Sequence, residues 1–228
     1  MEVKKTQLTP VSDSTSESLA EAVYESLLEG IVLGQLSPGM FLSAAKLSEK
    51  LEVSRTPTHD ALWMLASDGL VEIQPGRRAR VAQFGRDDLW EIFEMRKLLE
   101  GFAAELAAGR MDQRQFGPLR RMADELESKK SVDDWTRRWS DFDELFHRMI
   151  AESSGNRRLA KDISRYHLLH RGFNRVSTDF ESLQRALAEH LSILDALEAR
   201  DGRGARAAMK DHIGAWQIYF TEKFHEPD

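Results

Sequence analysis

Three histidines and one aspartate have the residue types and the spacing of a transition-metal site. Asp143 and His147 are four residues apart, so on a helix both side chains leave the same face. His190 and His212 lie further along the chain, each within a helical stripe of apolar residues. Because such stripes face a protein interior, these four ligand groups can converge on one ion.

Three neutral imidazoles and one carboxylate favour a divalent transition metal over calcium or magnesium. Zinc is the preferred ion, with nickel, manganese and iron as alternatives, and positions are left for water or for ligand oxygens. A single core histidine is more often a hydrogen-bonded packing residue, so spacing alone leaves a packing role open. The two stripes are Leu183, Leu187, His190, Leu194 and Met209, His212, Trp216, Tyr219.

Composition narrows the chemistry and the compartment. The 228 residues include no cysteine, which excludes disulfides, thiolate nucleophiles and cysteine-ligated zinc. The net charge of −6 argues against nonspecific adhesion to nucleic acid, so any DNA binding needs a local basic patch. No apolar run reaches the roughly 20 residues of a membrane span, and the polar start does not resemble a signal peptide. We therefore expect a cytoplasmic protein.

Six long helical stretches must position the metal ligands. Plausible helix stops fall at Gly109, at residues 154–156 and at residues 201–202. An antiparallel six-helix bundle is the simplest packing for these helices. The helical period predicts helices over residues 87–108, 112–130, 132–153, 156–176, 179–200 and 203–224.

The preceding residues have the pattern of a winged helix-turn-helix. We expect helices over 18–33 and 44–51, and a third that starts at Thr56-Pro57 and ends near Asp68-Gly69. Two short strands, 70–73 and 79–82, surround Pro75-Gly76 and predict a β-hairpin wing. The expected fold is therefore mainly α. Its expected parts are a flexible arm over 1–17, a DNA-binding domain over 18–83, a linker over 84–86 and a helical domain over 87–225.

Polar and basic residues gather where such a domain would meet DNA. A helix-turn-helix reads the major groove with the N-terminal end of its second helix, where Arg55 is suited to grip guanine. The other candidates on that helix are Ser54, Thr56, Thr58 and His59. Charge runs are often only solvated surface, which is the alternative for the wing. The wing candidates are Gly76, Arg77, Arg78 and Arg80.

Residues 31–81 resemble the winged helix of the GntR regulators. By this resemblance, Arg55 contacts operator bases and Gly76 marks a wing tip that enters the minor groove. His59-Asp60 stands where the family usually has Arg-Glu, Ala44 replaces a common Glu, and Ala45 occupies a position that is sometimes basic. These departures imply weaker or differently specified operator binding. The matching pieces are Gly34-x3-Pro38-Gly39-x2-Leu42, Leu47-x3-Leu51-x-Val53-Ser54-Arg55-Thr56-Pro57, Ala61-Leu62-x2-Leu65, Asp68-Gly69-Leu70-Val71 and Gly76.

Residues 87–212 resemble the FCD effector domain of the FadR subfamily. The resemblance implies that all four metal-ligand positions are filled, and the six-helix count is similar to the VanR-like branch. Fatty-acyl effectors, which a metal-free branch binds, are not expected. The shared pieces are Arg96-x2-Leu99-Glu100, Asp143-x2-Phe146-His147, Ser154-Gly155-Asn156, Glu189-His190-x2-Ile193-x2-Ala196-Leu197 and Met209-x2-His212-Ile213.

Arg96 is the main candidate for binding an effector. It lies on an apolar helical stripe, so its guanidinium should face the bundle cavity and grip a carboxylate. An ion pair with Glu100 is the alternative. Asn174 is the second effector-binding candidate. Other candidates for the cavity wall are Trp135, Trp139, Tyr166, His167, His170 and Arg171.

Together these patterns predict a DNA-binding transcriptional regulator that acts as a repressor. We expect a homodimer on a palindromic operator, controlled by a small carboxylate or sugar acid bound at the metal. A metalloenzyme that acts on a small carboxylate through the same three histidines and aspartate is the alternative. The interior stripes offer only Glu100 as a further carboxylate for a general base, which disfavours the enzyme. A purely structural metal remains a third reading.

Overall fold

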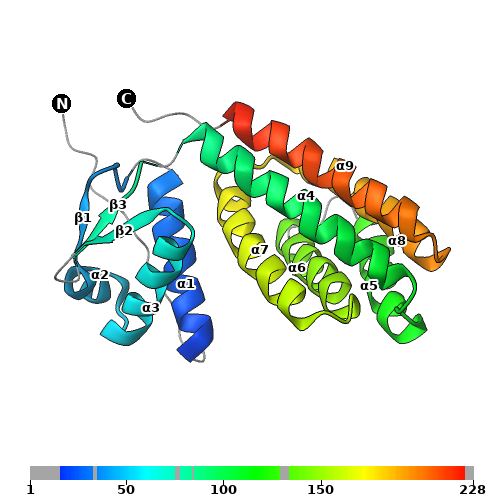
Figure 1. Ribbon diagram of the computed structural model, residues 1–228, viewed down its shortest axis with the longest axis horizontal. Coiled ribbons are helices and arrows are strands. Elements are labelled where there is room, and N and C mark those ends of the chain that lie inside the picture. The colour runs from blue at the N-terminus through cyan, green and yellow to red at the C-terminus, as the bar shows by residue number, and fades with distance from the viewer. Residues whose placement is uncertain (1–15, 33–34, 75–77, 84, 129–133, 224–228) are drawn as a thin grey trace. The chain divides into compact units, whose positions relative to one another are not determined.

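The computed structural model describes residues 16–32, 35–74, 78–83, 85–128 and 134–223 (Figure 1). The chain divides into two compact units. One contains the N-terminal region up to Asp88 together with Leu168–Ser177, and the other contains Leu89–His167 and Thr178–Lys223. The predicted fold class is confirmed, because the described residues are mainly helical and include one small sheet.

The N-terminal unit is a winged helix-turn-helix with one more strand than the sequence predicted. Its helices are α1 (Ser16–Val32), α2 (Ala44–Leu51) and α3 (Arg55–Ser67). The wing strands β2 (Val71–Gln74) and β3 (Arg78–Val81) pair antiparallel, and the extra strand β1 (Phe41–Leu42) pairs with the other edge of β3. With only two residues, β1 is too short for its side chains to reveal an alternating pattern.

Local capping explains the helix-turn-helix. The Ser43 side chain accepts a hydrogen bond from the Lys46 backbone at the start of α2. Glu52 follows α2 as its C-cap, and its φ of 57° lies in the left-handed region. Ser54 then takes an extended conformation and precedes α3. The turn therefore depends on one residue in a conformation that favours glycine.

The core of this unit lies where α1 packs against α3. The side chains of Leu27, Leu51, Leu65 and Leu70 are fully buried. At the edge of this contact the Tyr24 hydroxyl donates a hydrogen bond of 2.7 Å to Asp68. Burial of these leucines, worth about 1.5–3 kcal/mol each, holds the outer face of α3 in a fixed orientation.

Six helices make up the C-terminal part of the described chain, as predicted. They are α4 (Arg86–Ala108), α5 (Gln113–Ser128), α6 (Trp135–Ser153), α7 (Arg157–Ser177), α8 (Phe180–Glu198) and α9 (Gly202–Lys223). Asn156 caps α7 by accepting from two backbone amides, and Asp179 caps α8 by accepting from the Ser182 backbone amide. Gly155, with a φ of 73°, makes the sharp turn between α6 and α7.

Helices α4 and α9 run antiparallel and in close contact (Figure 1). A Cβ atom at Gly202 would lie 3.0 Å from the Glu105 carbonyl, so a side chain there would crowd this approach. At the other end, the Gln217 amide donates to the Trp90 carbonyl and to Glu94. Among the described residues, no helix is both long and apolar enough to cross a membrane.

Candidate metal centre and nucleic-acid interface

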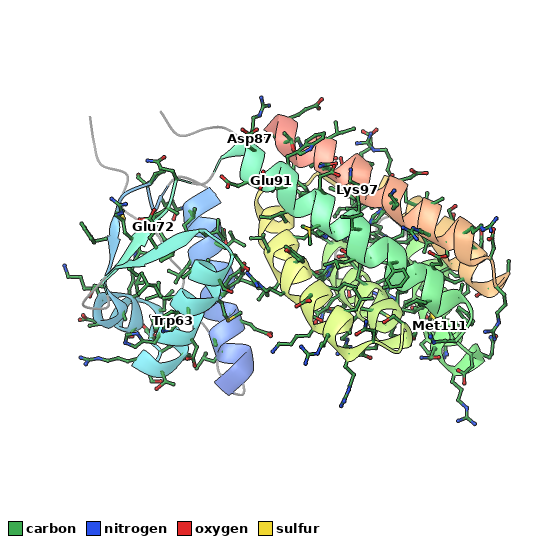
Figure 2. The ribbon with its side chains drawn as sticks, viewed as in Figure 1. Trp63, Glu72, Asp87, Glu91, Lys97 and Met111 are labelled. Atoms are coloured by element: carbon green, nitrogen blue, oxygen red, sulfur yellow. The ribbon has the colours of Figure 1, made fainter. Side chains whose placement is uncertain are left out.

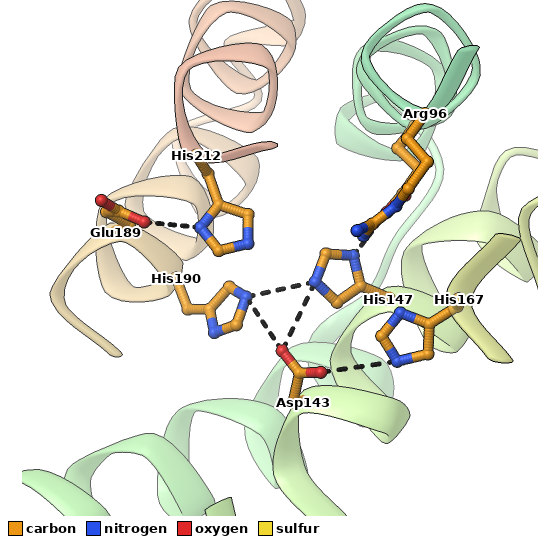
Figure 3. A network of polar contacts seen from close by, with 8 residues as sticks. Arg96, Asp143, His147, His167, Glu189, His190 and His212 are labelled. Carbon is orange, nitrogen blue, oxygen red and sulfur yellow. Dashed lines mark hydrogen bonds and ion pairs between the residues drawn. The ribbon is translucent and has the colours of Figure 1, made fainter. Parts of the chain in front are cut away.

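The four predicted ligands lie together inside the helical bundle (Figure 3). Asp143 and His147 come from adjacent turns of α6, His190 comes from α8, and His212 comes from α9. All four side chains are buried. The aromatic and leucine residues around them on these helices explain why three helices turn these polar groups toward one another.

The ligand atoms lie at distances that suit one ion. The Nε2 atoms of His147 and His190 are 3.2 Å apart, and Asp143 Oδ1 is 3.6 Å from each of them. Ring nitrogens of His147, His190 and His212 all lie within 4.8 Å of one another. Ligands about 2.0–2.2 Å from a shared ion are separated by roughly 3.2–4.4 Å, so these residues fit a transition metal.

Two carboxylates fix the orientation of two of the imidazoles. His147 Nδ1 donates to Glu100 on α4 at 2.5 Å, and His212 Nδ1 donates to Glu189 on α8 at 2.7 Å. With Nδ1 carrying the proton, a neutral imidazole presents the lone pair of Nε2 to the interior. This is the tautomer that a metal ligand requires, and carboxylate–histidine pairs of this kind commonly accompany metal sites.

His190 is held differently. Its Nδ1 is buried and has no hydrogen-bond partner among the described residues. Its ring instead stacks on Trp139, with ring centroids 5.1 Å apart, and lies against Phe146 at 4.2 Å. Aromatic packing, rather than a carboxylate, therefore orients the His190 ring.

The electrostatics of the cluster set a buried carboxylate against several imidazoles. Burial alone would raise the pKa of Asp143, but the imidazoles of His147, His167 and His190 lower it well below its usual range. Burial opposes a charge on His147, yet Glu100 and Asp143 raise the pKa of His147 to about 9. Without a metal, His147 therefore carries a second proton between two carboxylates at neutral pH, and a divalent ion would take the place of that proton.

The remaining imidazoles stay neutral. Burial lowers the pKa of His190 well below its usual range, and a charge on nearby His212 would lower it further. Burial also lowers the pKa of His212, although Glu189 partly opposes this. The pKa of His167 falls to about 3, chiefly because of burial. Neutral imidazoles are the form that binds metal.

Arg96 makes the ion pair that was the alternative reading and keeps further donors inside the bundle. Its Nε donates to Glu100 Oε1 at 2.7 Å. Its two terminal nitrogens, Nη1 and Nη2, are buried and have no hydrogen-bond partner among the described residues. Figure 3 shows the Arg96 side chain turned toward His147. Two unsatisfied donors on a buried cation are costly, and a carboxylate would satisfy both.

His167 is the residue whose importance the sequence understated. It was only one of several candidates for the cavity wall, but its Nε2 lies 3.4 Å from Asp143 Oδ2, and it is buried. The sequence showed only that His167 lies on a predicted helix among polar residues. That position does not reveal that His167 faces Asp143 from another helix. For Asn174, the second effector candidate, the side chain lies outside the described residues.

The N-terminal end of α3 presents most of the DNA-contacting residues that were predicted for this helix. Ser54, Arg55, Thr56 and His59 are exposed. Thr58 is not: its side chain is fully buried, and its hydroxyl contacts Ser48 Oγ at 3.0 Å and the Ser54 carbonyl at 3.1 Å. The prediction that Thr58 contacts DNA is therefore corrected, because Thr58 locks α3 against α2.

The sequence did not single out Trp63, which is 62% exposed on α3 (Figure 2). It follows His59 by four residues, so the two side chains share one face of the helix. That spacing was the signal that could have identified it.

The wing is only partly described. Arg80 pairs with Glu72 on the neighbouring strand at 2.6 Å, which reduces the charge it can offer to DNA. Arg78 begins β3, but its side chain lies outside the described residues, as do Gly76 and Arg77 entirely. Among the described residues, the N-terminal end of α3 therefore carries most of the exposed candidates for DNA contact.

Comparison with known proteins defines the class. Residues 19–81 match the family "Bacterial regulatory proteins, gntR family", and residues 91–215 match "FCD domain". The second match alone covers more than half of the chain. The protein belongs to the GntR family of DNA-binding transcriptional regulators and carries an FCD domain, as FadR- and VanR-like regulators do. These families are regulators and not enzymes, so the metalloenzyme alternative is set aside.

Individual relatives agree with this assignment. The chain is 26% identical to the HTH-type transcriptional repressor RspR of Escherichia coli K12, over 92% of this chain and 90% of RspR. It is 30% identical to the HTH-type transcriptional regulator LutR of Bacillus subtilis 168, over 85% of this chain and 97% of LutR. The solved structure of E. coli McbR/YncC covers 94% of this chain and all of its own, with a TM-score of 0.71 at 22% identity, and shares the fold.

Proposed function

We propose that this regulator is a repressor whose operator binding is controlled by a small carboxylate bound at a divalent metal. Asp143, His147, His190 and His212 would hold the ion, with zinc preferred over nickel, manganese or iron. The observation that carries the proposal is the buried cluster of three imidazoles and a carboxylate, with two imidazoles turned inward by Glu100 and Glu189. The metal would supply a cationic, oxygen-binding centre.

The effector class follows from what surrounds the ion. Arg96 Nη1 and Nη2 offer two donors in the planar arrangement that matches a carboxylate. A metal with open positions favours oxygen ligands. A small hydroxycarboxylate or sugar acid satisfies both, because its carboxylate can reach Arg96 while another oxygen reaches the ion. Asn174 remains a proposed effector-binding residue.

The DNA contacts are proposed from the exposed end of α3. Arg55 would read a base in the major groove, while Ser54, Thr56 and His59 would contact phosphates or base edges. Gly76, Arg77, Arg78 and Arg80 remain proposed contacts of the wing. Because one recognition helix reads only a few base pairs, we propose a homodimer on a palindromic operator. The repressor assignment is supported by the named role of RspR. Acting on DNA, the protein would work in the cytoplasm.

The metal is tested on protein purified without chelator. Elemental analysis should find about one divalent ion per chain, and thermal melts should shift downward after chelation and recover when zinc is restored. A bound effector should raise stability by about 2.7 kcal/mol at a hundred times its dissociation constant. In the double variant His190→Ala, His212→Ala, the melting temperature should no longer respond to zinc. A wild type that contains no metal and ignores both zinc and chelator contradicts the proposed sensing site.

The DNA contacts are tested on an operator selected from random sequence. Arg55→Ala should cost about 1–3 kcal/mol of binding and relax the sequence preference, whereas Arg78→Ala should weaken all sequences to a similar degree. Two chains per operator at saturation are expected by light scattering. Unchanged operator binding by Arg55→Ala contradicts the docking geometry, and one chain per operator contradicts the dimer.

A further inference from the structure

The two oxygens of Asp143 face different partners. Oδ1 lies 3.6 Å from the Nε2 atoms of both His147 and His190, on the side where the ligand atoms gather. Oδ2 lies 3.4 Å from Nε2 of His167, which comes from α7, a helix that supplies none of the four ligands (Figure 3). The carboxylate is therefore placed between the metal-facing imidazoles and a fourth imidazole.

His167 is held firmly enough to act on that carboxylate. Its side chain is buried, and its ring packs against the ring of His147 with centroids 4.8 Å apart. In this position the His167 ring lies against the imidazole of His147, and its Nε2 faces the carboxylate of Asp143. A proton on Nε2, 3.4 Å from Oδ2, would let His167 donate to an oxygen that would otherwise be free to turn toward the ion.

We propose that His167 is a positioning residue of the metal centre, which holds Asp143 Oδ2 so that only Oδ1 binds the ion. This inference rests on the proposed metal function. Such a contact gives Asp143 an outer partner as Glu100 does for His147 and Glu189 does for His212. A carboxylate that binds through one oxygen also leaves one more coordination position for an effector than a carboxylate that binds through two.

The alternative is that His167 itself binds the ion, because its ring nitrogen lies within 4.8 Å of ligand atoms of Asp143 and His147. The geometry favours positioning, since His167 faces the oxygen turned away from His190. The two roles differ in the number of imidazoles on the metal. X-ray absorption of the zinc-loaded wild type should count three for a positioning role and four for a ligand.

Two substitutions separate positioning from packing. His167→Gln keeps an N–H donor but loses the ring, and His167→Phe keeps the ring but loses the donor. Zinc dissociation constants, measured by competition with a chromophoric chelator, should rise about 10–100-fold for His167→Phe and less for His167→Gln. His170→Phe, which replaces a buried histidine on the same helix, is the control and should bind zinc within about two-fold of the wild type.

The results that overturn the inference are distinct from those that overturn the metal function. The positioning role alone is contradicted if His167→Phe binds zinc as tightly as the wild type does. It is also contradicted if His167→Gln loses more zinc affinity than His167→Phe does. Four imidazoles in the wild type also remove it. A wild type that binds no zinc overturns the proposed metal function and this inference together. Melts of the metal-free variants check folding, and the wild-type absorption measurement needs no variant.

Discussion

The ion pair between Arg96 and Glu100 gives the sharpest test of the buried network. Both side chains are almost wholly inaccessible, at 1% and 2% exposure, and Arg96 Nε is 2.7 Å from Glu100 Oε1. Glu100 also accepts from His147. Replacing Glu100 by Gln removes the only carboxylate that the described structure places on this guanidinium, and leaves a buried cation without a counter-charge.

The expected cost of Glu100→Gln is about 3–5 kcal/mol of unfolding free energy, the usual cost of breaking one partner of a buried pair. The same helix offers a matched control. Arg206 and Glu105 are also 2.7 Å apart, but their side chains are 43% and 35% exposed. Water solvates both charges there, so Glu105→Gln should cost only about 0–1 kcal/mol.

The assay is urea unfolding of the two variants and the wild type in metal-free form, which separates the ion pair from metal binding. The pKa of Glu100 is lowered because Arg96 and His147 outweigh its burial. The Glu100 charge therefore contributes its full share of the unfolding free energy above the ordinary pKa of 4.5. This stabilisation is lost as the pH falls below 4.5 toward the lowered pKa. Equal costs for Glu100→Gln and Glu105→Gln at neutral pH would refute the reasoning.

Three further predictions follow from particular residues. Because the pKa of His147 is raised to about 9, zinc binding at pH 7.5 should release about one proton, and zinc binding above pH 9 should release fewer. Calorimetry in buffers of different ionisation enthalpy measures the number of protons released. A binding enthalpy that is the same in all buffers at about pH 7.5 would contradict this prediction. Glu52→Gly should stabilise the protein by up to about 1 kcal/mol because Glu52 has a φ of 57°, whereas Glu49→Gly inside α2 should destabilise it by about 1 kcal/mol. Thr58→Val should cost about 1–3 kcal/mol of stability without changing DNA affinity per folded molecule, and a selective loss of DNA affinity would restore Thr58 as a contact.

The sequence predicts most of the fold because its signals are local. Apolar residues at helical spacing and caps such as Ser43 are set by neighbours in the chain, and they mark the helices correctly. Strand β1 escapes prediction because its two residues are defined only by pairing with β3. Thr58 was misjudged for a similar reason, since its burial depends on contact with Ser48 from another helix.

The candidate centre was predictable to the extent that its residues lie on apolar stripes. His190 and His212 stand among leucines and aromatics, so their inward direction follows from the helical period. The outer partners follow no such pattern. Glu189 is adjacent to His190 in sequence, yet it holds His212 on the next helix, and this pairing exists only because α8 and α9 pack side by side.

Arg96 and Glu100 would connect the proposed effector to the proposed metal, because Arg96, Glu100 and His147 form one continuous set of contacts. Glu100 Oε1 accepts a hydrogen bond from Arg96 Nε, and Glu100 Oε2 accepts one from His147 Nδ1. A single carboxylate therefore orients both the proposed effector-binding cation and a proposed metal ligand. An anion that binds Arg96 Nη1 and Nη2 satisfies donors that are otherwise buried without partners, and so favours the guanidinium position that keeps Glu100 on His147. If the proposed metal and effector both bind, linkage requires that each changes the affinity of the other by the same factor, and these contacts predict that each strengthens the other.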